Sequence, residues 1–595
     1  MKTSNFILSI LLLAFGTIAK AEKKDSIVDR NITVEREYKP LIQDAGKINT
    51  SPKMIEPSVQ KATPRYSDFN LPLNADFNIH TLPSAELQLE KRRISKGGFA
   101  RLGLGNYLNT LADFAYPLIK KTDTRLDFSL NHLGTFGGKT HSTTNAALAF
   151  DKYFKTFNLY TGLNAGHEYF KYYGNSFNAN GGMVNMDSLA AKNPVNPYYT
   201  ETHSEGLNPL ARSQRLNNLA NDSTLQTFWR VNAYAGIRSL ALTKGVQYNA
   251  EIQYKSFSAH NGIKENHFRT LGQINMDYND NRVGLDVELN NITYSTKQAD
   301  YLNFYDAYAV YTLNPYYKIE TDDYNVRLGV RSSFTFVPGS VAVHPSLDVN
   351  AEWKVAPEYL SLYGGITGEQ AVNTQNKIFD ENRFLSPDIR VKDTSTPIDF
   401  FAGIKLKPIY NLLFDAYVDY SAIDNQYFFF NKEYDFSLFN SSIIASNFYT
   451  LYTNKFDVLY SKATHLKVGM RANYNIRRVV NVELKGAYNG WHVNSEQYAW
   501  NKPKWEANLN TDVYLTHDLS ISANLFYEGE RYAKLGTMAM RMRPKVDINL
   551  GASYSTNSWF TAFVKINNLI NNPYEMYYGY QVQGINALVG VAFSF

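Results

Sequence analysis

The chain has 595 residues, a formal net charge of +5 and a mean hydropathy of −0.36. A protein that crosses a membrane with several apolar helices would be far more hydrophobic, so the composition excludes that class. The near balance of charge indicates no nucleic-acid partner. The absence of cysteine excludes disulfides, thiolate metal sites and a lipid-modified N-terminal cysteine.

The N-terminal residues have the pattern of a secretory signal peptide. Lys2 supplies a positive charge, and residues 6–15 form an apolar run that is too short to span a bilayer. Ala19 and Ala21 form a cleavage site of the A-x-A type. We therefore expect residues 1–21 to be removed and the mature protein to be exported.

Residues 22–97 differ in composition from the rest of the chain. They carry many charges, little sustained alternation and the prolines Pro40, Pro52, Pro57, Pro64, Pro72 and Pro83. Such a segment buries little apolar surface by itself, and a proline-rich chain spans about 3.1 Å per residue. We expect an extended periplasmic segment that reaches a partner or threads into a lumen. A loosely ordered extension is the alternative.

From Gly98 onward, apolar and polar residues alternate with a period of two. Residues 125–131, 282–290, 504–513 and 545–554 each place apolar side chains opposite charged, amide or small ones. This pattern fits a membrane barrel, which has one face toward lipid and one toward a polar interior. The 44 tyrosines also suit the aromatic girdles of such a barrel. The strands of a soluble β-sandwich, the alternative, are usually shorter, about 5–6 residues.

The expected connections between these strands alternate between short and long, as they do in outer-membrane barrels. Short connections are expected near residues 279–281, 408–410, 477–478, 516–518 and 555–558. Long connections are expected at residues 173–222, 371–395, 425–463, 491–502, 529–543 and 568–580. We therefore predict an all-β fold: a transmembrane antiparallel β-barrel of about 22 strands over residues 98–595, with both chain ends in the periplasm.

The last strand carries an outer row of apolar side chains, namely Ile585, Ala587, Val589, Val591, Phe593 and Phe595. The opposite row is mostly small or polar. A chain that ends on an aromatic residue in such a strand resembles the terminal signal of bacterial outer-membrane β-barrels. The resemblance implies that Phe593 and Phe595 are recognised by the barrel-assembly machinery of a Gram-negative cell. It also implies that the protein resides in the cell outer membrane, in contact with membrane lipid.

The segment Asn568–Tyr580, N-L-I-N-N-P-Y-E-M-Y-Y-G-Y, directly precedes this last strand and resembles the closing hairpin of TonB-dependent receptors. The expected strand number also agrees with the size of the barrel in that family. The resemblance implies solute uptake across the outer membrane, with TonB as a partner.

The sequence departs from that family near its N-terminus. The plug of these receptors is a globular domain with an I-R-G-type strand, and residues 22–97 show no such strand. We therefore predict a plug-reduced barrel, whose lumen is filled by residues 22–97, by infolded loops or by another polypeptide. The connection 173–222 is long and has no evident secondary structure, so we expect it to fold inward or over the mouth.

No catalytic or metal-binding motif is present, so we expect no enzyme activity and no cofactor. A hydrolase with Ser, His and Asn on separate strands is the alternative. The loop aromatics Tyr198, Tyr199, Phe428, Phe429 and Phe430 are candidate contacts for sugars or for a surface lipoprotein. They are equally compatible with ordinary girdle residues. The charges of the inner row either select solutes or form cross-strand ladders, and we favour the ladders.

Two functions follow from these observations. The resemblance favours a transporter that moves a nutrient across the outer membrane, with or without TonB. The reduced plug and the proline-rich extension favour a subunit or scaffold of an outer-membrane export or assembly complex, bound to an outer-membrane lipoprotein or another barrel. We favour transport on the family analogy.

Overall fold

The computed structural model describes residues 97–184, 225–240, 245–260, 262–279, 281–296, 306–387, 389–433 and 451–595. The signal peptide with Ala19 and Ala21, the extension up to residue 96, and Tyr198 and Tyr199 lie outside the described residues. Our expectations for these segments stay predictions.

The described residues form a closed antiparallel β-barrel of 22 strands, as the sequence predicts. The first half of the wall consists of β1 (Phe99–Gly105), β2 (Asn109–Lys120), β3 (Thr124–Thr135), β4 (His141–Tyr153), β5 (Phe157–Lys171), β8 (Leu225–Ser239), β9 (Gln247–Ala259), β10 (Ile263–Tyr278), β11 (Asn281–Thr296), β12 (Tyr308–Glu320) and β13 (Tyr324–Val337). The second half consists of β14 (Ser340–Ala356), β15 (Leu360–Ala371), β16 (Thr394–Ile409), β17 (Leu412–Glu433), β18 (Leu451–Ile476), β19 (Val480–Val493), β20 (Trp505–Tyr514), β21 (Leu519–Glu528), β24 (Lys545–Asn557), β25 (Phe560–Asn567) and β28 (Asn586–Ser594).

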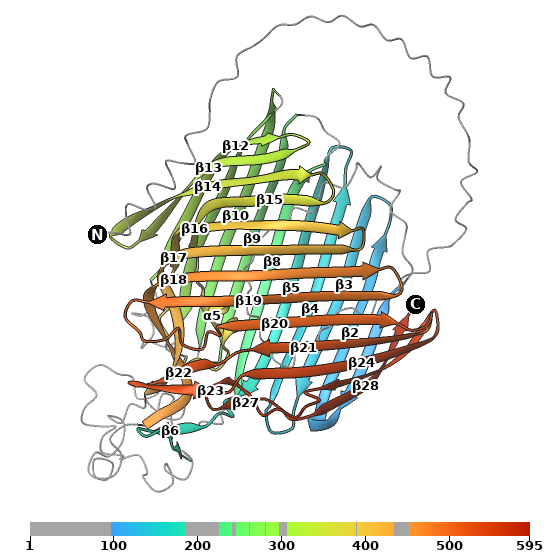
Figure 1. Cartoon of the computed structure of the whole chain (residues 1–595), viewed down its shortest axis with the longest axis vertical. Coiled ribbons are helices and arrows are strands. Elements are labelled where there is room, and N and C mark those ends of the chain that lie inside the picture. Colours follow the sequence, from blue (N-terminus) through green and yellow to red (C-terminus); the bar gives the residue numbers. More distant parts are fainter. Residues whose placement is uncertain are drawn as a thin grey trace, which may run out of the picture. The chain divides into compact units, whose positions relative to one another are not determined.

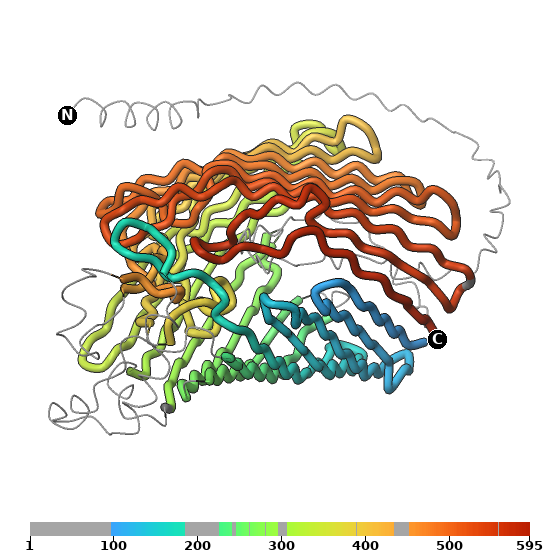
Figure 2. Tube along the Cα trace, turned by 90° about the horizontal axis from the view of Figure 1, so that it is seen from below, coloured from blue at the N-terminus to red at the C-terminus, as the bar shows by residue number. Residues whose placement is uncertain are grey.

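The barrel closes where its first and last strands pair. Phe99 lies opposite Ser594, at the start of a register that continues without a shift to the end of β1. Next to this pair, the backbone N–H of Phe595 donates to the carbonyl of Gly98 at 2.9 Å. Figure 2 shows the wall of late strands, in orange and red, facing the wall of early strands, in blue and green. Closure gives both edges of the sheet a partner, which removes the exposed edges of an open sheet.

The two faces of the wall differ as the alternation predicts. In β28, Val589 is 60% exposed, whereas the neighbouring Leu588 is 1% exposed. In β11, Leu285 is exposed, whereas the next residue, Asp286, forms an ion pair with Arg327 on β13 at 2.6 Å. The apolar row therefore forms the outer face, and the charged row faces the interior, where ion pairs connect the strands as a ladder.

Connection length differs between the two ends of the barrel. At the end that holds the C-terminus, short turns span residues 321–323, 410–411, 477–479, 515–518 and 558–559. At the opposite end, long connections span residues 372–393, 494–504, 529–544 and 568–585. We call this opposite end the mouth.

The prediction of a loop over residues 425–463 is wrong for most of its length. β17 and β18 stay paired as far as Asn431↔Phe456 and beyond, past the points where β16 and β19 end. Phe428–Phe430 therefore lie on a strand. Two adjacent antiparallel strands satisfy each other's backbone groups, so the hairpin continues past the rim without support from the rest of the wall.

Glycines on the inner face lie beneath tyrosine rings of the neighbouring strand. Five cross-strand pairs have this arrangement: Gly162–Tyr234, Gly236–Tyr160, Gly284–Tyr316, Gly403–Tyr363 and Gly469–Tyr417. A Cβ added at Gly469 would lie 2.4 Å from the Tyr417 ring. The guanidinium of Arg471 in turn lies 4.8 Å from the centre of that ring. The inner face is therefore built from aromatic rings packed flat on the backbone and covered by cations.

The remaining short elements are η1 (Asn106–Leu108), β6 (Ser176–Asn178), β7 (Met183–Val184), α5 (Gln375–Glu381), β22 (Arg531–Leu535), β23 (Met538–Met542), β26 (Glu575–Tyr577) and β27 (Tyr580–Gln581). Figure 1 shows α5, β6, β22 and β23 near the mouth, at the end of the strands away from the C-terminus. β6 pairs with the start of β18, so the first residues of the predicted loop 173–222 bind the protruding hairpin. In the described part of the chain, no helix is long and apolar enough to cross a membrane.

The assignment of the outer face can be tested with a pair of neighbouring residues. Leu509 lies between Leu484 and Leu525 in the outer row, and Asn508 bonds to Asn524 on the inner face. We expect Leu509→Arg to destabilise the folded barrel in lipid by about 2–4 kcal/mol, because a charge on the lipid face loses its hydration. Asn508→Arg should cost clearly less in the same unfolding titration. Equal losses would show that the register is wrong.

The glycine–tyrosine packing gives a second test. Gly469→Ala places a methyl group against the Tyr417 ring, so we expect a loss of about 1–3 kcal/mol in the free energy of unfolding. Gly486→Ala on the adjacent strand is the matched control, because the nearest atom to its added Cβ would be 3.8 Å away. Urea unfolding of the barrel in lipid measures both variants. A Gly469→Ala barrel as stable as the control would contradict this packing.

Candidate functional site at the barrel mouth

Three connections from separate parts of the chain fold together at the mouth. They are residues 372–393, which contain α5, residues 529–544, which contain β22 and β23, and residues 568–585, which contain β26 and β27. We call these three connections the lid. Arg531 donates to the carbonyl of Met576 at 2.7 Å, and the Tyr577 hydroxyl donates to the carbonyl of Glu381 at 2.9 Å. The three connections are therefore hydrogen-bonded to one another.

The lid has an apolar core that includes side chains of the barrel. The lid contributes Ile378, Phe379, Phe384, Leu385, Ile389, Met576, Tyr577 and Tyr580. The barrel side contributes Phe170, Tyr172, Phe228 and Phe257 near β5, β8 and β9, and Tyr427, Phe429 and Phe456 on β17 and β18. β10 to β16 separate these two groups of strands in the wall. One buried cluster therefore bridges distant parts of the rim, and each of its large side chains contributes about 1.5–3 kcal/mol by burial.

Helix α5 is short and is held by a residue of the wall. The hydroxyl of Thr374 caps the helix by accepting the backbone N–H of Lys377 at 3.1 Å. The carboxylate of Glu265 on β10 accepts the backbone N–H groups of Gln375 at 2.6 Å and Asn376 at 3.3 Å. These bonds satisfy the first turn, which has no partners within the helix, and they join the helix to the barrel.

Asp393 ties the two ends of the α5 connection together. Its carboxylate accepts the backbone N–H of Asn373 at 2.9 Å and the hydroxyl of Tyr308 at 3.0 Å. Burial raises the pKa of Asp393 to about 6, although these two hydrogen bonds and the charge of Lys377 act in the opposite direction. The α5 connection therefore leaves the wall and returns to it at the same place, next to Asp393.

A buried carboxylate joins the lid to the opposite part of the rim. Glu168, near the end of β5, pairs with Arg383 of the lid at 2.8 Å. It also pairs with Arg230 on β8 at 2.5 Å and lies 3.2 Å from His141 on β4. Because these groups are largely removed from water, loss of one partner leaves an uncompensated charge.

Glu381, the last residue of α5, connects the lid with β17 and with the connection 494–504. Lys502 pairs with one carboxylate oxygen at 3.0 Å, and the hydroxyl of Tyr427 donates to the other. The helix is therefore bonded at its start to β10 and at its end to the β17 side of the rim.

A second buried charge cluster supports β22 and β26. Glu528, Arg531 and Lys545 are at most 1% exposed in their side chains. Lys545 lies 2.7 Å and Arg531 3.7 Å from the same oxygen of Glu528. Arg531 also donates to the carbonyl of Glu575 at 2.6 Å. The carboxylate of Glu528 is therefore shared by a cation of the lid, Arg531, and a cation at the start of β24, Lys545.

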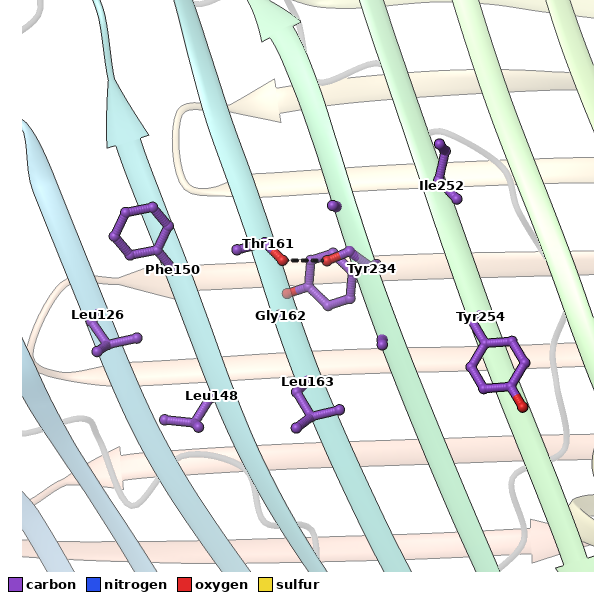
Figure 3. Close-up of a pocket in the computed structure, with 11 residues that line it drawn as sticks. Leu126, Leu148, Phe150, Thr161, Gly162, Leu163, Tyr234, Ile252 and Tyr254 are labelled. Atoms are coloured by element: carbon purple, nitrogen blue, oxygen red, sulfur yellow. Dashed lines mark hydrogen bonds between the residues drawn. The ribbon is translucent and has the colours of Figure 1, made fainter.

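A separate hollow lies away from the mouth, on the outer face of the wall. It has about 560 Å³ and is lined by apolar side chains such as Leu126, Leu148 and Leu163. Figure 3 shows these side chains over the strands, together with the hydrogen bond from the Thr161 hydroxyl to the Tyr234 carbonyl, 2.7 Å long. A hollow without free polar groups suits the acyl chain of a lipid better than a polar solute.

The structure places the sequence-predicted aromatic residues in different environments. Phe429 belongs to the lid core, Phe428 is buried beside Trp500, and Phe430 is half-buried. Phe428 and Phe429 thus belong to two different buried clusters, and a role of these residues as external contacts stays a prediction. Phe593 and Phe595 lie on the outer row, where β28 pairs with β1. Phe595 stacks on Tyr116, with 6.1 Å between the ring centres. The role of these two residues in barrel assembly stays a prediction.

The residues that hold the lid were not singled out from the sequence. Glu168, Glu265 and Glu381 are far apart in the chain, and no short motif contains them. The usable signal was the run of aromatic residues inside the connection 568–580. A polar loop exposed to solvent does not need four tyrosines, whereas a loop with its own core does.

No protein-family model matches the sequence, and no curated protein matches it either. Solved structures do match the barrel. The ferripyoverdine receptor of the outer membrane of Pseudomonas aeruginosa is 12% identical with a TM-score of 0.56, over 84% of this chain and 72% of that one. The ferric-catecholate import receptor Fiu from E. coli K12 is 11% identical with a TM-score of 0.56, over 85% and 82%. The copper transporter OprC is 12% identical with a TM-score of 0.57, over 85% and 82%.

The chain has the barrel fold of these receptors. This likeness confirms the fold that the resemblance to TonB-dependent receptors implies. The receptor-type barrel of the present chain is the described part that follows residue 96, with the lid at its mouth.

The buried cluster beneath the lid gives a third test. Glu528→Gln leaves Arg531 and Lys545 without their shared counter-charge, so we expect a loss of about 3–5 kcal/mol in the stability of this region. Glu530→Gln is the matched control, because Glu530 pairs with Arg541 at the surface, where such pairs contribute about 0–1 kcal/mol. Hydrogen exchange of the backbone in residues 529–544 and 568–585 measures both. Similar protection in the two variants would argue against an electrostatic role for the cluster.

Proposed function

We propose that this chain is an outer-membrane transporter, with its N-terminus in the periplasm, in which the lid is the gate of the solute pathway. The observation that carries the proposal is the buried core that joins opposite parts of the rim. The likeness to a receptor described as importing ferric catecholate and to a copper transporter supports the choice of transport. Contact with TonB through residues 22–97 follows from the same analogy and is part of the proposal.

The need for a gate follows from the width of the barrel. A barrel of this strand number encloses a wide lumen, which would breach the permeability barrier if it were open at both ends. The α5 connection begins and ends on the adjacent strands β15 and β16, and its other contacts are the lid core and the bonds of Glu265 and Glu381. A segment with two adjacent anchors can swing away without unpairing the wall.

The second candidate function is a subunit or scaffold of an outer-membrane export or assembly complex. One observation favours it: the cavity at the lid has about 70 Å³. This is far below the roughly 300–1,000 Å³ of a typical ligand pocket. In this alternative the lid is a permanent seal, and the protein binds a lipoprotein or another barrel.

A conductance measurement tests the gate. We expect the purified mature protein to conduct poorly in planar bilayers and a variant with residues 375–391 replaced by a short Gly-Ser linker to form a large, non-selective pore, because the lid core loses its central segment. A Gly-Ser insertion at the mouth turn Pro338–Gly339 is the control and should leave conductance unchanged. A linker variant as tight as the wild type would contradict the proposal that the lid is the gate.

Purification in mild detergent distinguishes the transporter from the subunit of a complex. Envelope proteins that co-purify in stoichiometric amounts, and that are lost when residues 22–97 are deleted, would support the role as a subunit of a complex and argue against transport. A barrel that purifies alone, together with a solute-dependent growth defect in a deletion strain, would support the transporter.

A further inference from the structure

A small cavity lies between the barrel rim and the lid. It is lined from the rim by Lys139, His141 and Tyr173 and from the lid by Arg383 and Gln583. Its volume of about 70 Å³ exceeds the roughly 10–15 Å³ that one water needs, so the cavity has room for a group of several heavy atoms. Two basic side chains and a histidine therefore border one partly open cavity.

Lys139 is the most informative of these residues. It belongs to the turn between β3 and β4, and its ammonium donates to the carbonyl of Val582 in the lid. The same ammonium lies 6.0 Å from the centre of the Tyr173 ring. Within the described residues, Lys139 forms no ion pair with a carboxylate. Burial lowers the pKa of Lys139, because the charged ammonium is removed from water without a counter-charge beside it.

The other basic groups of the cavity share one carboxylate. Arg383 and His141 both lie against Glu168, which also serves Arg230. Glu168 therefore already meets more than one cation, and it leaves the charge of Lys139 unbalanced. A small space bordered by such groups has a positive potential, and it suits an anion that accepts charge-assisted hydrogen bonds.

We propose that this cavity binds a small anionic group, a carboxylate or a phosphate, that bridges the rim and the lid. Lys139 and His141 stay with the barrel, whereas Arg383, Val582 and Gln583 belong to the lid. An anion held by both sides stabilises the closed lid, and closure raises the affinity for the anion by the same factor. The site does not depend on transport, because a permanent seal would have it as well.

Hydrogen exchange of the full mature protein in an uncharged detergent tests this site, with inorganic phosphate as the probe. We expect phosphate at about ten times its Kd to slow exchange in residues 375–387 and 574–584 roughly tenfold. Lys139→Met should abolish this slowing, and Lys139→Arg should retain it because the charge is kept. Lys155→Met is the matched control, since Lys155 is exposed in a turn at the opposite end of the barrel.

The exchange of each variant is measured with and without phosphate. If Lys139→Met only loosens the lid, its exchange will already be faster without phosphate. The proposal would be overturned if neither inorganic phosphate nor phosphatidic acid slowed lid exchange in the wild type. So would an effect of the same size in Lys139→Met.

A lipid arm identifies the source of the anionic group. The protein is placed in nanodiscs of phosphatidylcholine alone or with phosphatidic acid, which exposes a phosphate monoester, and no free phosphate is added. Slower lid exchange only with phosphatidic acid would assign the site to a lipid head group. Slower exchange only with inorganic phosphate would assign it to a soluble anion.

Discussion

The pairing of β1 with β28 is the constraint on which the rest of the structure depends. A sheet of this size has two edges, and their unpaired N–H and C=O groups would otherwise seek partners in other chains. The continuous register between Phe99 and Ser594 and the following residues removes both edges. In the closed barrel the mostly apolar row of each strand faces outward and the mostly charged or polar row faces inward.

A closed barrel creates a second problem, which is the hole through its centre. Connections of the chain itself fold together at the mouth, and they pack on the rim through a hydrophobic core rather than through a few surface contacts. Around that core, Glu168 and Glu265 on the wall bond to lid residues, and Glu381 of the lid bonds to Tyr427 on β17. These carboxylates are buried with their partners, so they specify the position of the lid more than they stabilise it.

The lid therefore has the features of a two-state element. Its apolar core favours a single closed arrangement, and its anchors are localised at a few carboxylates. Charges that lack a full set of partners, such as Lys139, are the points where a ligand can add to the stability of the closed state. The proposed gate and the proposed anion site therefore lie at the same interface between rim and lid.

The strands, their inward and outward faces and their approximate number could all be predicted from the sequence, because alternation is local and each strand carries it independently. Residues such as Leu285 and Asp286 show their orientation within a single strand. The protruding hairpin and the lid could not be predicted. Phe429 meets Phe228 and Phe379 in one core only after closure brings β8 and β17 to the same opening. Contacts between segments far apart in the chain depend on the whole barrel, and no local pattern contains them.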